Sequence, residues 1–441
     1  MSKKRTETWL ALIVVAIGLV PVALMALWGY MSATATPLHP NPKDSPSVSR
    51  RAPLPGWAAA AEQGRELVRA ALNEQNLPGL SVAVGVDGDI VWAEGFGWAD
   101  LEKKVPVAPE MTFRIGTASK ALTSVAVGLL LEDGRLKLDE EIQTYVPAFV
   151  ETYAPASPEK HRPVTLRQLM GHVAGVPNDG GDEGPLFAER CTRPVDALQF
   201  FSGYERVLLF EPGTQYHYSS YGWILVSAAV EAAADEPFLT FMRRRVFEPL
   251  GMRDTVPESI TEPIPSRVTF YFPRFAADPR YGLHLTRPLH YSCYAGASVF
   301  LSTPSDLVRF GMAVNDGKLL QPATVRLLQT PQRLSSGQET GYGLGWDIDI
   351  VALAGERTRS VGHDGTSLGG TVASLMTFPE QRIAVAVTSN IAYAETEALA
   401  LKIAHAFHDA TSTHNPASSV AKNMAIPPPR SSRPTIAARR R

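Results

Sequence analysis

The sequence predicts a protein of the α+β class, in which antiparallel strand pairs and helices occupy separate stretches. Apolar strand patterns at residues 80–86 and 90–98 flank an Asp-Gly dipeptide, which is typical of a tight hairpin turn. Two further apolar runs, at residues 371–378 and 383–389, are joined by a Pro-Glu-Gln turn near the other end of the chain. Helices are predicted at residues 57–75, 117–133, 223–231 and 395–410. A strand is also predicted at residues 295–301, followed by a helix capped near Thr303, and a further strand is predicted to open at residues 341–346. Residues 178–185 have the composition of a loop.

Composition and charge limit the possible functions. The chain has 441 residues, of which 45% are hydrophobic and 20% charged, and this is an ordinary globular composition with ample length for a large core. The formal net charge of -2 argues against nucleic acid as a main partner. Two cysteines, Cys191 and Cys293, cannot form a disulfide framework. We expect two buried thiols, and a single bridge is the alternative in an oxidising compartment.

The N-terminal region has the pattern of a membrane anchor. Residues 1–8 are basic and are expected in the cytoplasm, and residues 9–31 are apolar and long enough to span a bilayer. The alternative is a cleaved signal peptide, because residues 33–35 resemble an Ala-x-Ala cleavage site. We favour the uncleaved anchor, since the apolar stretch is longer than that of a usual signal peptide. Residues 32–56, rich in Ser, Thr and Pro, predict a flexible linker to an exported domain.

The stretch Phe-Arg-Ile-Gly-Thr-Ala-Ser-Lys at residues 113–120 carries the strongest chemical signal. It turns at a glycine and runs into an apolar helix, so Thr117 and Lys120 lie on one helical face. A hydroxyl and an amine at this spacing are the parts of an activated nucleophile. The free N–H groups at the start of a helix suit a developing oxyanion, and burial of the amine favours its role as a base.

This stretch closely resembles the Ser-x-x-Lys motif of the penicillin-recognising serine hydrolases, in particular the class C β-lactamase, DD-peptidase and esterase group. Thr117 stands where that group has its nucleophilic serine. Ser119 matches the second serine of the motif, but it lies two positions further on and we do not expect it to replace the nucleophile. Residues 163–177 resemble the Leu-Leu-x-His-Thr-Ser-Gly stretch of the same group, in which His172 is expected to make structural hydrogen bonds at a helix end.

Two further motifs follow in the order of the family. Residues 210–222 resemble its Pro-Gly-x-x-x-x-Tyr-Ser-Asn loop, with Tyr218 at the tyrosine and Ser220 in place of the asparagine. This pattern is closest to the subgroup that includes the mitochondrial β-lactamase-like serine protease. Residues 361–370 resemble the strand at the cleft edge, in which His363 stands at the position of a substrate-binding Lys or His.

The resemblance implies a β-lactamase/transpeptidase-like α/β sandwich over residues 57–410, with an antiparallel sheet, flanking helices and a mostly helical insert. Residues 411–441 are expected to form a disordered basic tail. The chain shows no metal-binding or cofactor-binding motif, so we expect neither group.

The implied mechanism is acyl transfer to water. Thr117 forms the acyl-enzyme, Lys120 and Tyr218 share the proton transfer, and either of these two can be the base. The backbone N–H groups of Thr117 and Thr366 are expected to form the oxyanion hole. Among the remaining motif residues, Ser220 and Gly365 are expected to bind substrate, together with His363.

An imidazole at the position of His363 attracts a carboxylate less than lysine does. We therefore expect small-molecule or peptide substrates with ester or amide carbonyls rather than efficient β-lactam hydrolysis. The alternative is a membrane-anchored pseudoenzyme that binds peptide or cell-wall fragments, because the extra methyl group of threonine restricts the nucleophile.

Overall fold

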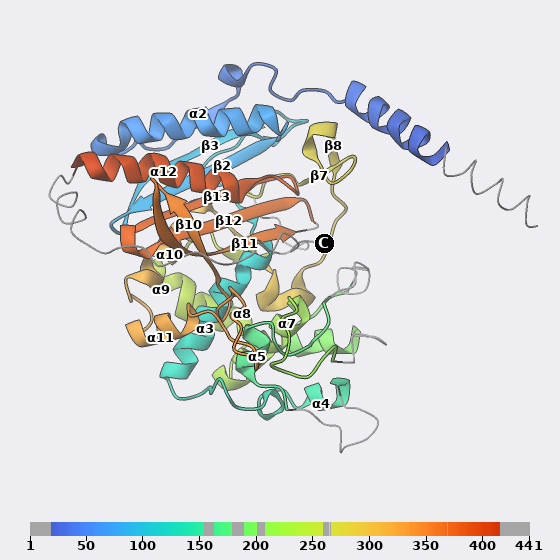
Figure 1. The fold of residues 1–441 in the computed structure, drawn as a ribbon, viewed down its shortest axis with the longest axis vertical. Coiled ribbons are helices and arrows are strands. Elements are labelled where there is room, and N and C mark those ends of the chain that lie inside the picture. Colours follow the sequence, from blue (N-terminus) through green and yellow to red (C-terminus); the bar gives the residue numbers. More distant parts are fainter. Residues whose placement is uncertain are drawn as a thin grey trace, which may run out of the picture.

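The computed structural model describes residues 19–153, 163–178, 189–200, 208–258, 264, 266–367 and 369–414. The strands of its main sheet are β1 (Ser47–Val48), β2 (Gly79–Val86), β3 (Asp89–Asp100), β4 (Val105–Pro106), β10 (Asp347–Leu353), β11 (Glu356–Ser367), β12 (Thr371–Phe378) and β13 (Ile383–Ser389). In the described part of the chain they form an eight-stranded antiparallel sheet in the order β1-β3-β2-β13-β12-β11-β10, with β4 paired to β3. The two ends of the chain meet where β13 pairs with β2, and Figure 1 shows this sheet above a lobe of helices. The predicted α+β sandwich is confirmed.

The predicted strand pairs form because their turns and their apolar side chains agree. Asp87 and Gly88 both have positive φ, at 52° and 92°, as a two-residue hairpin turn requires. Strands β12 and β13 begin and end at the residues that the apolar runs predict, and they are buried along their whole length. A strand buried on both faces carries a continuous apolar run rather than an alternating one, because helices cover the sheet on both sides.

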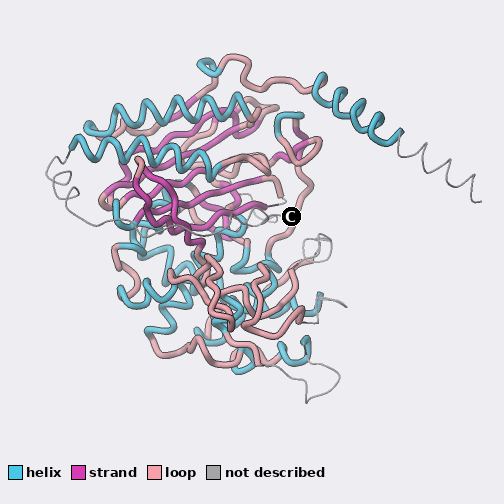
Figure 2. The backbone as a smooth tube through the Cα atoms, viewed as in Figure 1, coloured by secondary structure: helices cyan, strands magenta, loops and turns pink. Residues whose placement is uncertain are grey.

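Two helices cover the outer face of the sheet, namely α2 (Ala58–Glu74) and α12 (Thr396–His414). They lie side by side in Figures 1 and 2, and Phe407 of α12 stacks on Trp57 and Trp92 at centroid distances of 5.8 and 5.9 Å. The opposite face is covered by α10 (Pro304–Asn315), whose first turn is capped as predicted, since the Thr303 side chain accepts a hydrogen bond from the Asp306 N–H. Thus the N-terminal and C-terminal helices form one layer of the sandwich.

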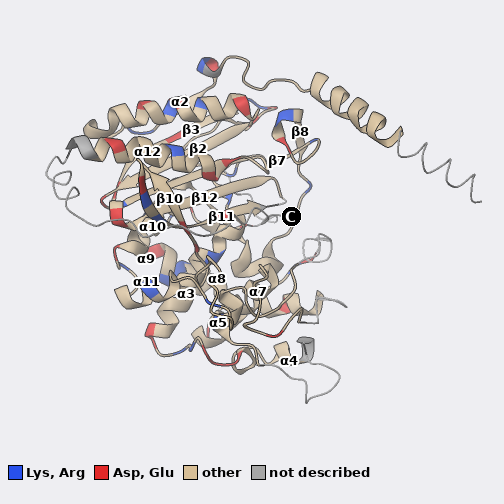
Figure 3. Cartoon of the chain, viewed as in Figure 1, with Lys and Arg blue, Asp and Glu red and all other residues tan. Residues whose placement is uncertain are grey.

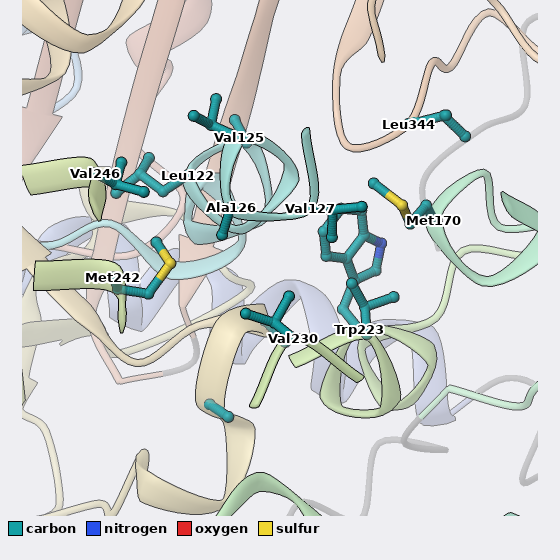
Figure 4. Packing of buried hydrophobic residues seen from close by; sticks show 14 of the residues in the cluster. Leu122, Val125, Ala126, Val127, Met170, Trp223, Val230, Met242, Val246 and Leu344 are labelled. Carbon is teal, nitrogen blue, oxygen red and sulfur yellow. The ribbon is translucent and has the colours of Figure 1, made fainter. Parts of the chain in front are cut away.

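The helical lobe is built around α3 (Ser119–Glu132), which is buried on all sides from its first residue to Leu130. A helix of this kind needs partners all round rather than along one stripe. Figure 4 shows Leu122 and Val125 of α3 with Met242 and Val246 on one side, and Trp223 on the other. The other helices of the lobe and its surroundings are α4 (Ala148–Tyr153), α5 (Leu166–Met170), α7 (Ser220–Ala234), α8 (Phe238–Phe241), α9 (Glu248–Leu250) and α11 (Pro322–Leu328), and a π-helical stretch covers Met242–Phe247.

Two segments differ from the strand predictions. Residues 295–301 were expected to form a strand, but Ser292–Ala297 form 3₁₀ turns and the strand β9 covers only Phe300–Ser302. The stretch 341–346 turns instead of opening a strand, because its glycines at 341 and 345 have positive φ. The remaining strands are β5 (Phe113–Arg114) and β6 (Val256–Pro257), both paired with β9, and the hairpin of β7 (Tyr271–Pro273) with β8 (Leu283–Leu285).

Residues 19–33 form a helix whose apolar side chains are exposed, with Trp28 at 55% and Tyr30 at 62%. Among the residues that the structure describes, none of the helices combines the length and the apolar character needed to cross a bilayer. The predicted span 9–31 begins outside the described residues, so it stays a prediction. The predicted tail also lies almost wholly outside them.

The expectation of a flexible linker over residues 32–56 is wrong for its central part. The His39 ring is buried and its Nε2 lies 2.9 Å from the Leu77 carbonyl oxygen, while Asn73 donates to the His39 carbonyl. Further along, β1 adds to the edge of β3, with Ser47 opposite Phe96. These contacts could not be predicted from the Ser- and Pro-rich sequence, because one buried imidazole and a two-residue strand produce no periodic pattern.

The expectation of two unpaired thiols is also wrong, because Cys191 and Cys293 form a disulfide with their Cα atoms 4.8 Å apart. The bond joins residues 189–200 to the Ser292–Ala297 turns, which pack on α7. The two cysteines are 102 positions apart in the sequence, and only the tertiary fold brings them together.

Replacing both cysteines with serine should lower the free energy of unfolding by about 2–4 kcal/mol, because the bond constrains a long loop of the unfolded chain. Urea unfolding of the variant and of the native protein, each with and without reductant, measures the difference. Reductant should bring the native protein to the stability of the variant and leave the variant unchanged. Equal stability of all four samples would contradict the prediction.

Candidate active site

Thr117 lies in the 3₁₀ turn Gly116–Ala118, between the end of β5 and the start of α3. Gly116 has φ +50°, and a Cβ there would lie 3.1 Å from the Thr366 carbonyl oxygen, so the turn runs close against β11. The Thr117 hydroxyl is half-buried and donates to the Asp364 carbonyl oxygen at 3.0 Å. The residue in the nucleophile position therefore stands between a helix start and an edge of the main sheet.

Lys120 is fully buried one turn further along the chain. Its Nζ donates to the Tyr218 hydroxyl at 2.9 Å and to the Ser220 hydroxyl at 3.2 Å. These two partners come from a segment almost a hundred residues away, at the start of α7. The structure thus brings together the amine and the phenol that the sequence predicted to share proton transfer.

His172 holds the backbone on both sides of Tyr218. Its carbonyl oxygen accepts from the His217 N–H at 2.9 Å, and its Nδ1 accepts from the Ser219 N–H at 3.0 Å. The imidazole also packs on the Tyr218 ring, with centroids 4.2 Å apart. Burial, and next the charge of Lys120, hold the pKa of His172 well below its usual value. The ring is therefore neutral with its proton on Nε2, and the predicted structural role at the end of α5 is confirmed.

Replacing His172 with phenylalanine should keep the ring packed on Tyr218 but leave the buried Ser219 N–H without its acceptor. We expect a loss of about 1–3 kcal/mol in the free energy of unfolding, the usual effect of an unsatisfied buried donor. Chemical denaturation measures it. A similar change at the partly buried His217, which lies two residues before Ser219, is the control and should cost less. If the His172→Phe protein is as stable as the native protein, the hydrogen bond from Ser219 to His172 does not stabilise the fold.

His363 is buried on β11 behind Tyr218, with the two ring centroids 6.5 Å apart. Its Nδ1 lies 2.6 Å from the Asp364 carbonyl, which only accepts, so Nδ1 carries a proton. Its Nε2 lies 2.9 Å from the hydroxyl of Tyr342, and burial raises the pKa of this phenol well above its usual value. Both imidazole nitrogens therefore have a hydrogen-bond partner. The Asp347 carboxylate, at 3.8 Å from Nδ1, is beyond hydrogen-bond distance.

The sequence placed His363 against the substrate, but only 3% of the residue is exposed in the structure. Tyr342, whose hydroxyl it contacts, is equally buried, with 1% of the residue exposed. Tyr342 itself was not expected in the site, because its motif of alternating glycines predicted only a strand.

Gly365 and Thr366 bring β11 against the nucleophile turn. A Cβ at position 365 would lie 1.8 Å from the Ile115 carbonyl oxygen, so only glycine allows this approach. Thr366 is exposed beside the Gly116 turn. The predicted oxyanion pair, the N–H groups of Thr117 and Thr366, thus belongs to two segments in contact.

The carboxyl group of Asp364 contacts the helix α12. It hydrogen-bonds to Glu397 of α12, and burial, then this neighbour, raise the pKa of Asp364 well above its usual range. The Asp364 backbone carbonyl, in contrast, accepts from Thr117 and His363.

Asn178 is a site residue that sequence reasoning missed. Its Oδ1 accepts from the Ser220 N–H at 2.9 Å, directly beside the serine that accepts from Lys120. The sequence interpreted residues 178–185 only as a loop, and 179–188 lie outside the described residues. Within the ranges that the structure describes, no three His, Cys, Asp or Glu side chains are grouped to hold a metal ion.

The chain is similar to known proteins over most of its length. The family model described as beta-lactamase matches residues 65–409. The mouse serine beta-lactamase-like protein LACTB, mitochondrial, is 28% identical over 426 residues, which cover 76% of each chain.

Solved structures match over most of the chain. The octameric penicillin-binding protein homologue from Pyrococcus abyssi has a TM-score of 0.64 at 24% identity and covers 79% of this chain and 77% of its own. The D-amino acid amidase from Ochrobactrum anthropi, solved with L-phenylalanine amide, has a TM-score of 0.63 at 22% identity and covers 81% and 99%. At these identities the structures show a shared fold.

Proposed function

Because the chain belongs to the beta-lactamase family, we propose that it is a hydrolase that forms an acyl-enzyme on Thr117. The observation that supports this most is the hydrogen bond of 2.9 Å from the buried Lys120 Nζ to the Tyr218 hydroxyl, one helical turn from Thr117. A binding protein needs no such pair, whereas a hydroxyl nucleophile needs a nearby group to take its proton.

The reaction begins when the Thr117 hydroxyl turns from the Asp364 carbonyl toward the substrate carbonyl carbon. A new C–O bond forms as the hydroxyl proton passes to the Lys120–Tyr218 pair, and the negative oxygen is stabilised by the N–H groups of Thr117 and Thr366. The leaving group departs with a proton from the same pair. Water then attacks the ester carbonyl and gives a proton to the pair. The bond between the carbonyl carbon and the Thr117 oxygen breaks, the pair returns a proton to this oxygen, and the acid is released.

Either Lys120 or Tyr218 acts as the base in this scheme. The direction of their hydrogen bond favours a shared role, because an ammonium that donates to a phenol oxygen stabilises the phenolate. Ser220 also accepts from Lys120, so the amine contacts two hydroxyl groups.

The proposed substrates are small molecules or peptides with ester or amide carbonyls. His363 stands where the family can have lysine, and its ring is held by hydrogen bonds to Tyr342 and to a backbone carbonyl. An imidazole that is enclosed in this way, with 3% of the residue exposed, offers little attraction for a substrate carboxylate. The amidase from Ochrobactrum anthropi, whose structure holds L-phenylalanine amide, supports the amide class.

Covalent labelling tests the proposal. The full chain is incubated with an activated acyl ester, a fluorescent penicillin and a fluorophosphonate, and adducts are located by intact mass and peptide mapping. We expect an adduct on Thr117 with the ester or the fluorophosphonate, and none in Thr117→Ala. If only Thr117→Ser is labelled, the native threonine has inactivated the site and the protein is a binding pseudoenzyme.

We also propose that residues 9–31 anchor the protein and place the domain outside the cytoplasm. Three observations support this: the exposed apolar side chains of helix 19–33, the basic N-terminus, and the Cys191–Cys293 disulfide, which forms in oxidising compartments. Carbonate extraction of membranes, with the N-terminal sequence of the product, tests it. An intact N-terminus in the pellet is expected, and a soluble chain that begins near residue 36 would favour signal cleavage.

A further inference from the structure

Arg114 is a buried cation that lies just before the nucleophile turn. Its Nε and Nη2 donate to the two carboxylate oxygens of Glu258 at 2.6 and 2.7 Å. Its Nη1 donates to the Gly369 carbonyl, and the guanidinium lies between the rings of Phe270 and Tyr291, 4.1 and 4.9 Å from their centroids. A planar fork with donors on two sides is therefore fixed in one orientation.

The partner of this guanidinium is the turn between β11 and β12. The Gly369 N–H donates to the Tyr291 hydroxyl at 3.0 Å, while its carbonyl accepts from Arg114. A Cβ at position 369 would lie 2.3 Å from the Arg114 Nη1 and 2.4 Å from the Tyr291 hydroxyl. Both polar atoms of one glycine are thus held, and the closeness of its partners admits no larger residue.

Both residues of the Arg114–Gly369 contact lie close in sequence to the proposed oxyanion donors. Arg114 lies three residues before Thr117, and Gly369 lies three residues after Thr366. The Arg114–Gly369 bond therefore joins the two segments that carry the proposed oxyanion donors. A second bond between the same segments, from the Thr117 hydroxyl to Asp364, is lost when the hydroxyl turns to attack.

We propose that Arg114, through Gly369, is a positioning residue that sets the separation of the Thr117 and Thr366 amides. This inference rests on the proposed acyl-enzyme mechanism. During attack the Arg114 contact remains in place, so it holds β11 against the nucleophile turn while negative charge develops between the two amides. Glu258 fixes Arg114 from the far side, and Arg267 donates to the same carboxylate at 3.1 Å.

Geometry of this kind affects the rate more than binding, because oxyanion donors act on the tetrahedral state. A displacement of about 1 Å at such a site can cost about a hundredfold in rate. Lysine at position 114 keeps the charge but cannot bond to a carboxylate with two nitrogens and to the turn with a third. Phenylalanine at position 291 keeps the aromatic face but releases the Gly369 N–H.

The test compares Arg114→Lys and Tyr291→Phe with the native full chain. We expect kcat with an activated ester to fall about ten- to a hundredfold, with KM nearly unchanged, and the fluorophosphonate labelling rate to fall in parallel. The control is Arg65→Lys, which alters another pair of an arginine with a buried glutamate, Glu94, on the outer face of the sheet. It should lower the thermal midpoint without changing kcat.

Two results would overturn the inference. One is a native kcat in both folded variants, and the other is a loss in kcat that Arg65→Lys reproduces. If Arg114→Lys does not fold, Tyr291→Phe decides alone, because it removes a single hydroxyl. If the acyl-enzyme mechanism is wrong, the labelling experiment gives no adduct in the native protein. That result would overturn both proposals.

Discussion

Lys120→Met should reduce kcat/KM for an activated ester by about a thousandfold or more. The native Nζ is the donor to Tyr218 and Ser220, and methionine fills a similar volume without any charge or donor. The phenol then loses the cation that stabilises it as a proton acceptor, and the Thr117 hydroxyl loses its route for proton transfer. Steady-state hydrolysis and the rate of fluorophosphonate labelling both measure the effect.

The fold should survive this change, because methionine fills a similar volume and the cost of desolvating a fully buried amine is removed. A thermal midpoint equal to or above that of the native protein is the expected control. Lys103→Met, at a side chain that is 76% exposed, should leave the rate unaltered. A folded Lys120→Met protein that keeps more than about a tenth of its activity would exclude the lysine from proton transfer.

Tyr218→Phe should lower kcat by about a hundred- to a thousandfold. The ring stays packed on His172, and the backbone on both sides stays bonded to it, so the loss reports the hydroxyl alone. The Lys120 ammonium keeps Ser220 as a partner. Parallel kinetics at several pH values measure both the loss and the pH dependence that remains.

Tyr216→Phe is the matched control, since this ring also lies beside His172, at 5.9 Å. We expect it to change kcat by about threefold or less, as a substitution that leaves the proton-transfer pair intact. If the two phenylalanine variants behave alike, the hydroxyl of Tyr218 has no chemical role. Lys120 would then be the sole base.

The sequence predicted those parts of the fold and site that local patterns encode. The hairpin at Asp87-Gly88 and the ends of β12 and β13 follow from turn chemistry and apolar runs. The motif order placed Thr117, Lys120 and Tyr218 in one site, and the structure brings Lys120 and Tyr218 together, one helical turn from Thr117. In each of these features, a short stretch of neighbouring residues is enough to predict the local structure.

The contacts that were missed join distant segments with no local mark. Asn178 meets Ser220 across 42 positions, and the guanidinium of Arg114 meets the carbonyl of Gly369 across 255. Neither an asparagine in a loop nor an arginine in a short strand indicates its partner. The disulfide was misjudged for the same reason, because whether two cysteines pair depends on the distance between their Cα atoms.

Strand β1 makes residues before position 57 a part of the folded domain. It pairs with β3 along the outer border of the sheet, and the Thr36 carbonyl accepts from the Asn76 side chain further upstream. A chain trimmed to start at residue 57 would uncover unpaired N–H and C=O groups of β3, a ready template for strand exchange between molecules. Proteolysis within residues 36–48 should therefore cause the molecules to associate with one another. Removal of a mere linker would have no such effect.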